Sequence, residues 1–199
     1  MLRSCQKVVD WIEGYDCPWG IAGGWAIDLF VGNKTREHSD IEIAILREDQ
    51  HKIKTILADW SFQKAVKGEI VEWESETLKL PIHELHGYHE KSGERLEVLL
   101  NEVENDRWIF RRGPTITFPS SSLFLTTEGG IPYFHPAVVL LYKAKNAREK
   151  DHADFHAVKD LLCNEDQQWL CNAFKIHVPG HPWISHLQEG IKFSRGKGQ

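Results

Sequence analysis

The sequence lacks the features of several whole classes of protein. Lysine and arginine number 24 against 29 aspartates and glutamates, so the net charge is −5 and the positive excess needed for bulk nucleic-acid binding is missing. No apolar run approaches the roughly 18 residues of a membrane helix, and the N-terminus has no apolar signal-peptide core. The four cysteines form no close pair, as is typical of free thiols in a reducing compartment. We therefore expect a cytoplasmic protein that binds neither nucleic acid nor a membrane.

The pattern along the chain predicts an α+β fold. Apolar residues make up 41% of the 199, enough for a substantial core. Short apolar runs alternate with Gly, Pro and Ser up to about residue 135, and helical spacing follows. We expect a mixed β-sheet domain with flanking helices over residues 1–134 and a C-terminal helical subdomain over residues 135–199.

The clearest predicted strand spans residues 39–46, where three isoleucines alternate with other side chains. Because side chains on a strand alternate between its faces, Asp40 and Glu42 share the face opposite the isoleucines, about 7 Å apart. Two like charges this close repel each other unless a cation lies between them, and oxygen ligands suit Mg²⁺. The alternative is the solvated face of an amphipathic strand.

A glycine pair upstream supports the metal-binding interpretation. Gly23 and Gly24 directly precede a predicted helix at residues 25–31. Glycines at a helix N-terminus let backbone amides approach a phosphate, which the helix dipole also favours. A plain turn is the alternative for the pair alone. Together, the glycines and the acids predict one element that holds a polyphosphate and another that holds its metal.

Two segments carry a resemblance to a known family. Gly23-Gly24-Trp25-Ala26, followed by Thr35–Ile43, resembles the polymerase-beta-like nucleotidyltransferase superfamily, and more closely the aminoglycoside and lincosamide nucleotidyltransferases and their bacterial relatives. Residues 130–133, 140–145 and 150–155 are similar to the helical half of those relatives. The resemblance covers most of the chain, but it does not specify a substrate.

The resemblance implies a third carboxylate on a neighbouring strand, and the best match is Glu97. Its apolar neighbours would face the core while Glu97 faces the other way. The relatives often carry Asp at this position, so Glu97 departs by one methylene. Its competitors are Glu94, expected in a turn, and Glu102 and Glu104, expected beyond the strand. An ordinary exposed strand glutamate is the alternative.

Cationic partners for a triphosphate are also expected. Lys143 lies on an otherwise apolar helix predicted after Pro136, so it must either reach solvent along the surface or meet an anion. Lys145 and Lys150 are alternatives to it. Arg36, four residues before Asp40, would reach phosphate or pair with a nearby acid.

The function implied by the resemblance is transfer of a nucleoside monophosphate, above all AMP from ATP, to a hydroxyl of a small molecule. Asp40, Glu42 and Glu97 would be catalytic and hold Mg²⁺, with two ions expected. Gly23, Gly24, Arg36 and Lys143 would bind the nucleotide. The acceptor, by analogy an aminoglycoside- or lincosamide-like antibiotic, would lie in a cleft lined by Trp73, Trp108 and Tyr133. A homodimer is also considered.

Two alternatives remain open. One is a weak or inactive nucleotide-binding relative, favoured by Glu97 in place of Asp and by Ala137 where some relatives carry an acid. The other is a zinc hydrolase that uses His152 and His156, which lie four residues apart on a predicted helix. No HExxH motif and no evident third ligand accompany them.

Overall fold

The computed structural model describes residues 3–196, and one mixed sheet organises them. The strand order is β4-β3-β5-β6-β2-β1-β10-β9, with β7 pairing with β6 and β8 with β7. The strands are β1 (Trp19–Ile21), β2 (Glu42–Leu46), β3 (Trp60–Val66), β4 (Glu69–Glu72), β5 (Glu84–His89), β6 (Glu94–Glu104), β7 (Arg107–Ile109), β8 (Thr117–Pro119), β9 (Phe124–Thr126) and β10 (Pro132–Phe134). Two pairs, β2 with β6 and β1 with β10, are parallel, and the others are antiparallel.

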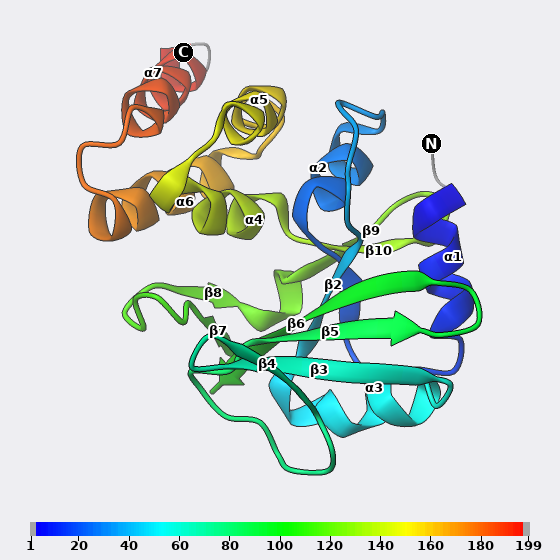
Figure 1. Cartoon of the computed structure of the whole chain (residues 1–199). Helices are drawn as coiled ribbons and strands as arrows, with labels where there is room; N and C mark the ends of the chain where they lie inside the picture. The colour runs from blue at the N-terminus through cyan, green and yellow to red at the C-terminus, as the bar shows by residue number, and fades with distance from the viewer. Residues whose placement is uncertain (1–2, 197–199) are drawn as a thin grey trace.

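Among the described residues, three α-helices lie before or between the strands in sequence, and four follow the last strand. They are α1 (Arg3–Trp11), α2 (Gly23–Val31), α3 (Gln50–Ile56), α4 (Pro136–Lys143), α5 (Glu149–Val158), α6 (Asn164–His177) and α7 (Trp183–Gly196). Figure 1 shows α4 to α7 gathered beside α2, while α3 lies on the other side of the sheet. The predicted α+β fold with a helical C-terminal part is confirmed.

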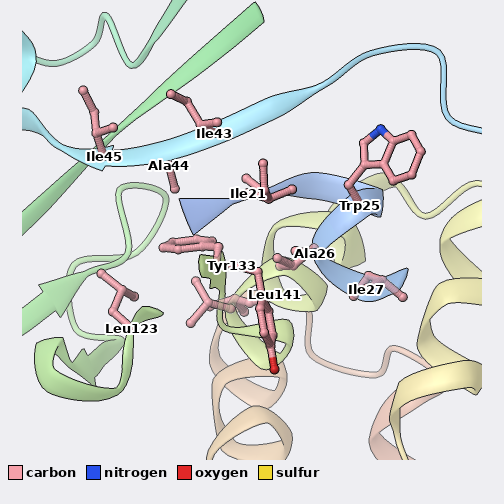
Figure 2. Close-up of a cluster of buried hydrophobic side chains, with 14 of the residues drawn as sticks. Ile21, Trp25, Ala26, Ile27, Ile43, Ala44, Ile45, Leu123, Tyr133 and Leu141 are labelled. Carbon is pink, nitrogen blue, oxygen red and sulfur yellow. The ribbon is translucent and has the colours of Figure 1, made fainter. Parts of the chain in front are cut away.

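Strand β2 is shorter than predicted, because it begins at Glu42 rather than at residue 39. Asp40 therefore lies on the approach to the strand rather than within it. Figure 2 shows Ile43 and Ile45 on one side of this strand and Ala44 on the other. All three are fully buried. The face that carries Glu42 is thus covered as well, which alternation alone did not predict.

The helix ends follow local rules. Helix α2 begins at Gly23, two residues earlier than the apolar pattern predicted. It ends at Gly32, which adopts the left-handed conformation (φ 82°) favoured in a helix C-cap. Helix α4 begins with Pro136 in its first turn, where a missing N–H costs nothing, and His135 accepts a hydrogen bond from the amide of Ala137.

Several elements differ from the sequence expectation. Strand β3 was not predicted, because its inner half alternates Trp60 and Phe62 while its outer half is polar near the sheet edge. Strand β10 is only three residues long, too short for a period to be seen. Strand β6 continues to Glu104, so Glu94, Glu102 and Glu104 all lie on it, contrary to the prediction.

One buried hydrophobic cluster joins the sheet to the helices. It includes Ile43 on β2, Ile27 on α2, Val138 on α4 and Phe155 on α5. The division into domains at residues 134 and 135 stays a prediction. Among the described residues, no helix is both long and apolar enough to cross a membrane.

Candidate active site

The parallel pairing of β2 and β6 sets Glu42 directly beside Glu97. The antiparallel partner of Glu97 on β5 is His86. Asp40 precedes β2 by two residues, and its charge acts on both glutamates. Sheet register thus brings together three acids from two separate segments of the chain.

Negative charge at this position is only partly compensated. Burial raises the pKa of Glu42, and Glu97 and Asp40 raise it further, while Lys143 opposes them. Burial also raises the pKa of Glu97, with His86 opposing the shift and Asp40 adding to it. Partly buried carboxylates that repel each other are stabilised by a cation placed between them.

The donor set therefore suits a hard divalent cation, since all of its ligands are carboxylate oxygens. Within the part of the chain that the structure describes, no three His, Cys, Asp or Glu side chains are already arranged to hold a metal ion. The chemistry of the three acids fits Mg²⁺, and their side chains would have to turn toward a common ion.

Neither Gly23 nor Gly24 leaves room for a side chain. Gly23 has φ 59°, and a methyl group there would overlap the carboxylate of Glu42. At Gly24 the same group would overlap the side chains of Arg36 and His38. The N-cap residue of α2 is Ala22, which makes no side-chain cap, so the first amides of the helix are left for another acceptor.

The segment between α2 and β2 is held by side chains of α2. Buried Asp28 accepts hydrogen bonds from the amide and hydroxyl of Thr35 and lies 2.7 Å from Nε2 of His38. Trp25 packs on the ring of His38 and donates through Nε1 to the carbonyl of Asp40 at 3.2 Å. These contacts fix the path that brings Asp40 to the acids.

Lys143 enters the site from α4. Its Nζ lies 2.9 Å from Asp151 and 2.9 Å from Asp154, both buried on α5. Arg36 contacts the same Asp154 with two hydrogen bonds of 2.9 Å. Burial alone would raise the pKa of Asp154, but its hydrogen bonds to Arg36 and Lys143 lower the pKa overall.

The three acids contribute to the walls of two cavities. The first, which we call the α1 cavity, has a volume of about 700 Å³ and lies between α1 and strands β5 and β6. Its walls include Trp11, Trp25, Tyr88, Asp40 and Glu97. Its size and its mixed aromatic and polar walls are typical of a site for a small molecule.

The second cavity, which we call the α4 cavity, has a volume of about 590 Å³. Glu42 and Gly23 line it from the sheet side. Four cationic side chains line it as well, namely Arg112, Lys143, Lys145 and Arg148. Glu42 therefore lines the cavity with four cations, whereas Asp40 and Glu97 line the α1 cavity.

A model of the aminoglycoside-2''-adenylyltransferase family matches residues 4–120, more than half of the chain. The chain belongs to this family. The matched segment contains both glycines and all three acids, and it ends before Lys143. The predicted resemblance to nucleotidyltransferases is thus confirmed, and membership supports a transferase.

Solved structures share the fold at low sequence identity. ANT(2")-Ia in complex with adenylyl-2"-tobramycin is 14% identical over 89% of this chain and 98% of that one, with a TM-score of 0.61. Lincomycin-bound LnuA is 20% identical over 81% of this chain and 98% of its own, with a TM-score of 0.57. An antigenic nucleotidyltransferase-like protein from Paracoccidioides brasiliensis is 13% identical over 94% and 91%, with a TM-score of 0.52. Among curated proteins, none matches significantly.

Most of the predicted site residues are divided between the two cavities. Gly23, Glu42 and Lys143 line the α4 cavity, and Asp40 and Glu97 line the α1 cavity. Gly24 and Arg36 line neither cavity, and Arg36 reaches the site only through Asp154. Its part in nucleotide binding stays a prediction.

The predicted aromatic lining is wrong. Trp73, Trp108 and Tyr133 are all buried in the hydrophobic core and line neither cavity. Trp108 donates instead to buried Asn101. Ala137 is fully buried too, so an acid there would lie in the core rather than in a cavity.

Sequence reasoning missed part of the cationic wall. Arg112 lies in the connection between β7 and β8, and Arg148 precedes α5. Neither stands in a motif, and one sequence gives no signal that a loop arginine faces a distant helix. In the α1 cavity, Trp11 and Tyr88 were also missed, because neither the partly buried position on α1 nor the exposed position on β5 shows a pattern of its own.

The histidines of the zinc alternative have other partners. Nδ1 of His152 accepts a hydrogen bond from Nε1 of Trp183 at 3.0 Å, and the ring of His156 packs against that of His186. In the described residues no third ligand completes a metal site around them. The zinc hypothesis gains no support from these contacts.

Proposed function

We propose that the protein transfers a nucleoside monophosphate, with AMP from ATP as the first candidate, to a hydroxyl of a small molecule in the cytoplasm. The observation that carries this proposal is that acids adjacent on the sheet line two cavities, Glu42 the α4 cavity and Asp40 and Glu97 the α1 cavity. The α4 cavity combines the N-terminus of α2 with several cations. A transfer reaction between two bound substrates needs catalytic groups that reach both of them.

The nucleotide would occupy the α4 cavity. The free amides at the start of α2 would bind phosphate oxygens, which the close approach at Gly23 permits. Lys143 would add positive charge while Asp151 and Asp154 fix its position. Arg36 would support the nucleotide indirectly, by holding Asp154 from its other side.

The acceptor would occupy the α1 cavity, with its hydroxyl toward the acids. The hydroxyl oxygen would attack the α-phosphorus, the bond from that phosphorus to the bridging oxygen would break, and pyrophosphate would leave. Glu97 would either share a metal ion or take the proton of the hydroxyl; in the second role its raised pKa makes it a stronger base than an exposed glutamate. Electrostatics and positioning would supply most of the rate enhancement.

Asp40, Glu42 and Glu97 would together hold Mg²⁺, with two ions expected. Bound there, the metal would offset negative charge on the transferred phosphate. The raised pKa values of Glu42 and Glu97, which come from burial and from nearby carboxylates, support a cation at this position.

The acceptor class is proposed from the family and from the wall of the α1 cavity. The family is described by its aminoglycoside chemistry, and a structural neighbour is lincomycin-bound. We therefore place a hydroxylated, antibiotic-like compound against Trp11 and Tyr88. A homodimer stays a prediction.

The proposal is tested by incubating the full chain with labelled ATP, Mg²⁺ and pools of hydroxylated compounds, and by measuring pyrophosphate release. We expect release in at least one pool, loss of release in Asp40→Asn, and no change in His152→Ala. ATP binding with no release in any pool would favour an inactive nucleotide-binding relative. Release that His152→Ala abolishes and Asp40→Asn leaves intact would overturn the assignment.

A further inference from the structure

Two of the four cations in the α4 cavity have carboxylate partners and two do not. Lys143 and Arg148 both pair with Asp151. Arg112 and Lys145 form no ion pair within residues 3–196. Both side chains are exposed, and both line the cavity.

Arg112 is held in place although it lacks an anion. Its Nη1 donates a hydrogen bond of 2.9 Å to the carbonyl of Tyr142, near the end of α4, and its guanidinium lies 5.4 Å from the centre of the Tyr142 ring. A guanidinium has several N–H donors, so one bond to a carbonyl leaves others for a ligand. The contact orients the group and reduces the entropy that binding would cost.

Positive charge accumulates around this group. Arg111 also stacks on Tyr142, at 5.5 Å, and His177 lies close enough that Arg112 and Lys145 act on it. Burial lowers the pKa of His177, and both cations lower it further. Glu84 acts on Arg111, but no ion pair with Arg112 or Lys145 is formed among the described residues, so these two cations can attract a multivalent anion.

We propose that Arg112 and Lys145 bind the β- and γ-phosphates of the nucleotide and then hold the pyrophosphate as it leaves. This inference rests on the proposed function, which places the nucleotide in the α4 cavity. Lys143, close to Glu42, serves the phosphate at the reacting end, and Arg112 and Lys145 serve the distal end. Arginine suits this role because its planar fork matches two phosphate oxygens at once.

The binding of three probes separates this role from a general effect of charge. ATP, AMP and inorganic pyrophosphate are titrated with Mg²⁺ into the wild-type chain, Arg112→Gln and Lys145→Gln by calorimetry. Since a hydrogen bond to a charged group is worth about 1.5–3 kcal/mol, each substitution should weaken ATP and pyrophosphate about tenfold or more. AMP, which lacks the distal phosphates, should bind within about twofold of wild type.

Matched controls account for charge and folding. Lys150→Gln removes an exposed cation of α5 that lines neither cavity, and it should leave all three affinities unchanged. Arg112→Lys keeps the charge and should recover part of the ATP affinity. Thermal melting of each variant shows whether Arg112 only caps the end of α4 or also contacts the ligand. If it only caps the helix, its substitution should lower the melting temperature and leave ATP affinity unchanged.

The outcomes distinguish the two proposals. If wild type binds ATP and both Gln variants bind it equally well, the role of Arg112 and Lys145 is overturned and the proposed function survives. An equal loss of AMP and ATP affinity would also overturn it, because the contact would then lie at the α-phosphate or the nucleoside. Failure of the wild-type chain to bind ATP would overturn both.

Discussion

Lys143 on α4 lies 2.9 Å from Asp154, whose other carboxylate oxygen accepts a hydrogen bond from Arg36. The side chain of Asp154 is fully buried and lies between two cations from distant parts of the sequence. Arg36 is thereby connected to Lys143 without lining either cavity. A substitution at Asp154 should therefore disturb the positions of both the Arg36 and the Lys143 side chains.

Removal of this shared carboxylate should be costly. We expect Asp154→Asn to reduce the free energy of unfolding by about 3–5 kcal/mol, because Arg36 and Lys143 would lose a buried counter-charge. Urea unfolding followed by tryptophan fluorescence measures the change. The control is Asp160→Asn, which removes an exposed carboxylate that pairs only with neighbouring Lys159. Equal stability of the two variants would contradict a structural role for Asp154.

Acid should destabilise the protein by protonating two carboxylates on α5, Asp151 and Asp154. Burial opposes ionisation of Asp151, but its bonds to Arg148 and Lys143 lower its pKa from 3.8 to about 2. The pKa of Asp154 is lowered as well. A carboxylate with a lowered folded-state pKa stabilises above its unfolded pKa, and this contribution is lost as pH falls toward the folded value. Stability should therefore decline from about pH 4 downward.

Urea midpoints at a series of acidic pH values test this decline. In Asp151→Asn the same series should show a shallower slope, since one linked proton is removed. An unchanged slope would mean that other carboxylates dominate acid unfolding.

Substitution of Glu42 should change stability and activity in opposite directions. Burial and the charge of Glu97 raise the pKa of Glu42, so the ionised form is disfavoured in the folded chain. Replacement by the neutral isostere in Glu42→Gln should raise the melting temperature at neutral pH without metal. The same change should reduce pyrophosphate release by about a hundredfold or more.

The control for this substitution is Glu104→Gln, at the exposed end of β6, which should alter neither quantity. A Glu42→Gln variant that is both less stable and fully active would remove Glu42 from the proposed site.

Two glycines with similar backbone conformations should behave differently. Gly23 and Gly32 both have positive φ, 59° and 82°, so alanine should cost each about 1–2 kcal/mol of stability. A methyl group at Gly32 meets open space, whereas at Gly23 it overlaps the carboxylate of Glu42. Only Gly23→Ala should also weaken ATP binding, as measured by titration calorimetry. Equal ATP affinity in the two variants would contradict a role for the turn at Gly23.

The sequence predicted the fold class, and local patterns indicated candidate site residues on the sheet. Alternation around Ile43 and Ile45 singled out Asp40 and Glu42, whereas Glu97 was named from the family resemblance and agrees with the alternation on its own strand. The glycine turn was visible as a pair before a helical run. The register that sets Glu42 beside Glu97 is a long-range property: the resemblance implied only a neighbouring strand, and the structure supplies the register.

The cations were harder to assign, because their roles depend on the packing of α4 against α5. The sequence shows Arg36 four residues before Asp40, but nothing in that spacing indicates that it bonds Asp154 in preference to a ligand. Arg112 occupies a loop whose meeting with Tyr142 depends on tertiary structure. The expected aromatic lining was wrong for a related reason, since Trp108 fits a core position as readily as a cleft.

Ile43, Ile27, Val138 and Phe155 belong to one buried cluster, which ties the strand that carries Glu42 to the helix that carries Lys143. Protein interiors are close-packed, so a rotation of that helix against that strand would open voids. A hinge between the two is therefore disfavoured, and the outline of the α4 cavity exists before any ligand arrives. Discrimination among nucleotides should then come from this fixed outline rather than from closure around the bound molecule.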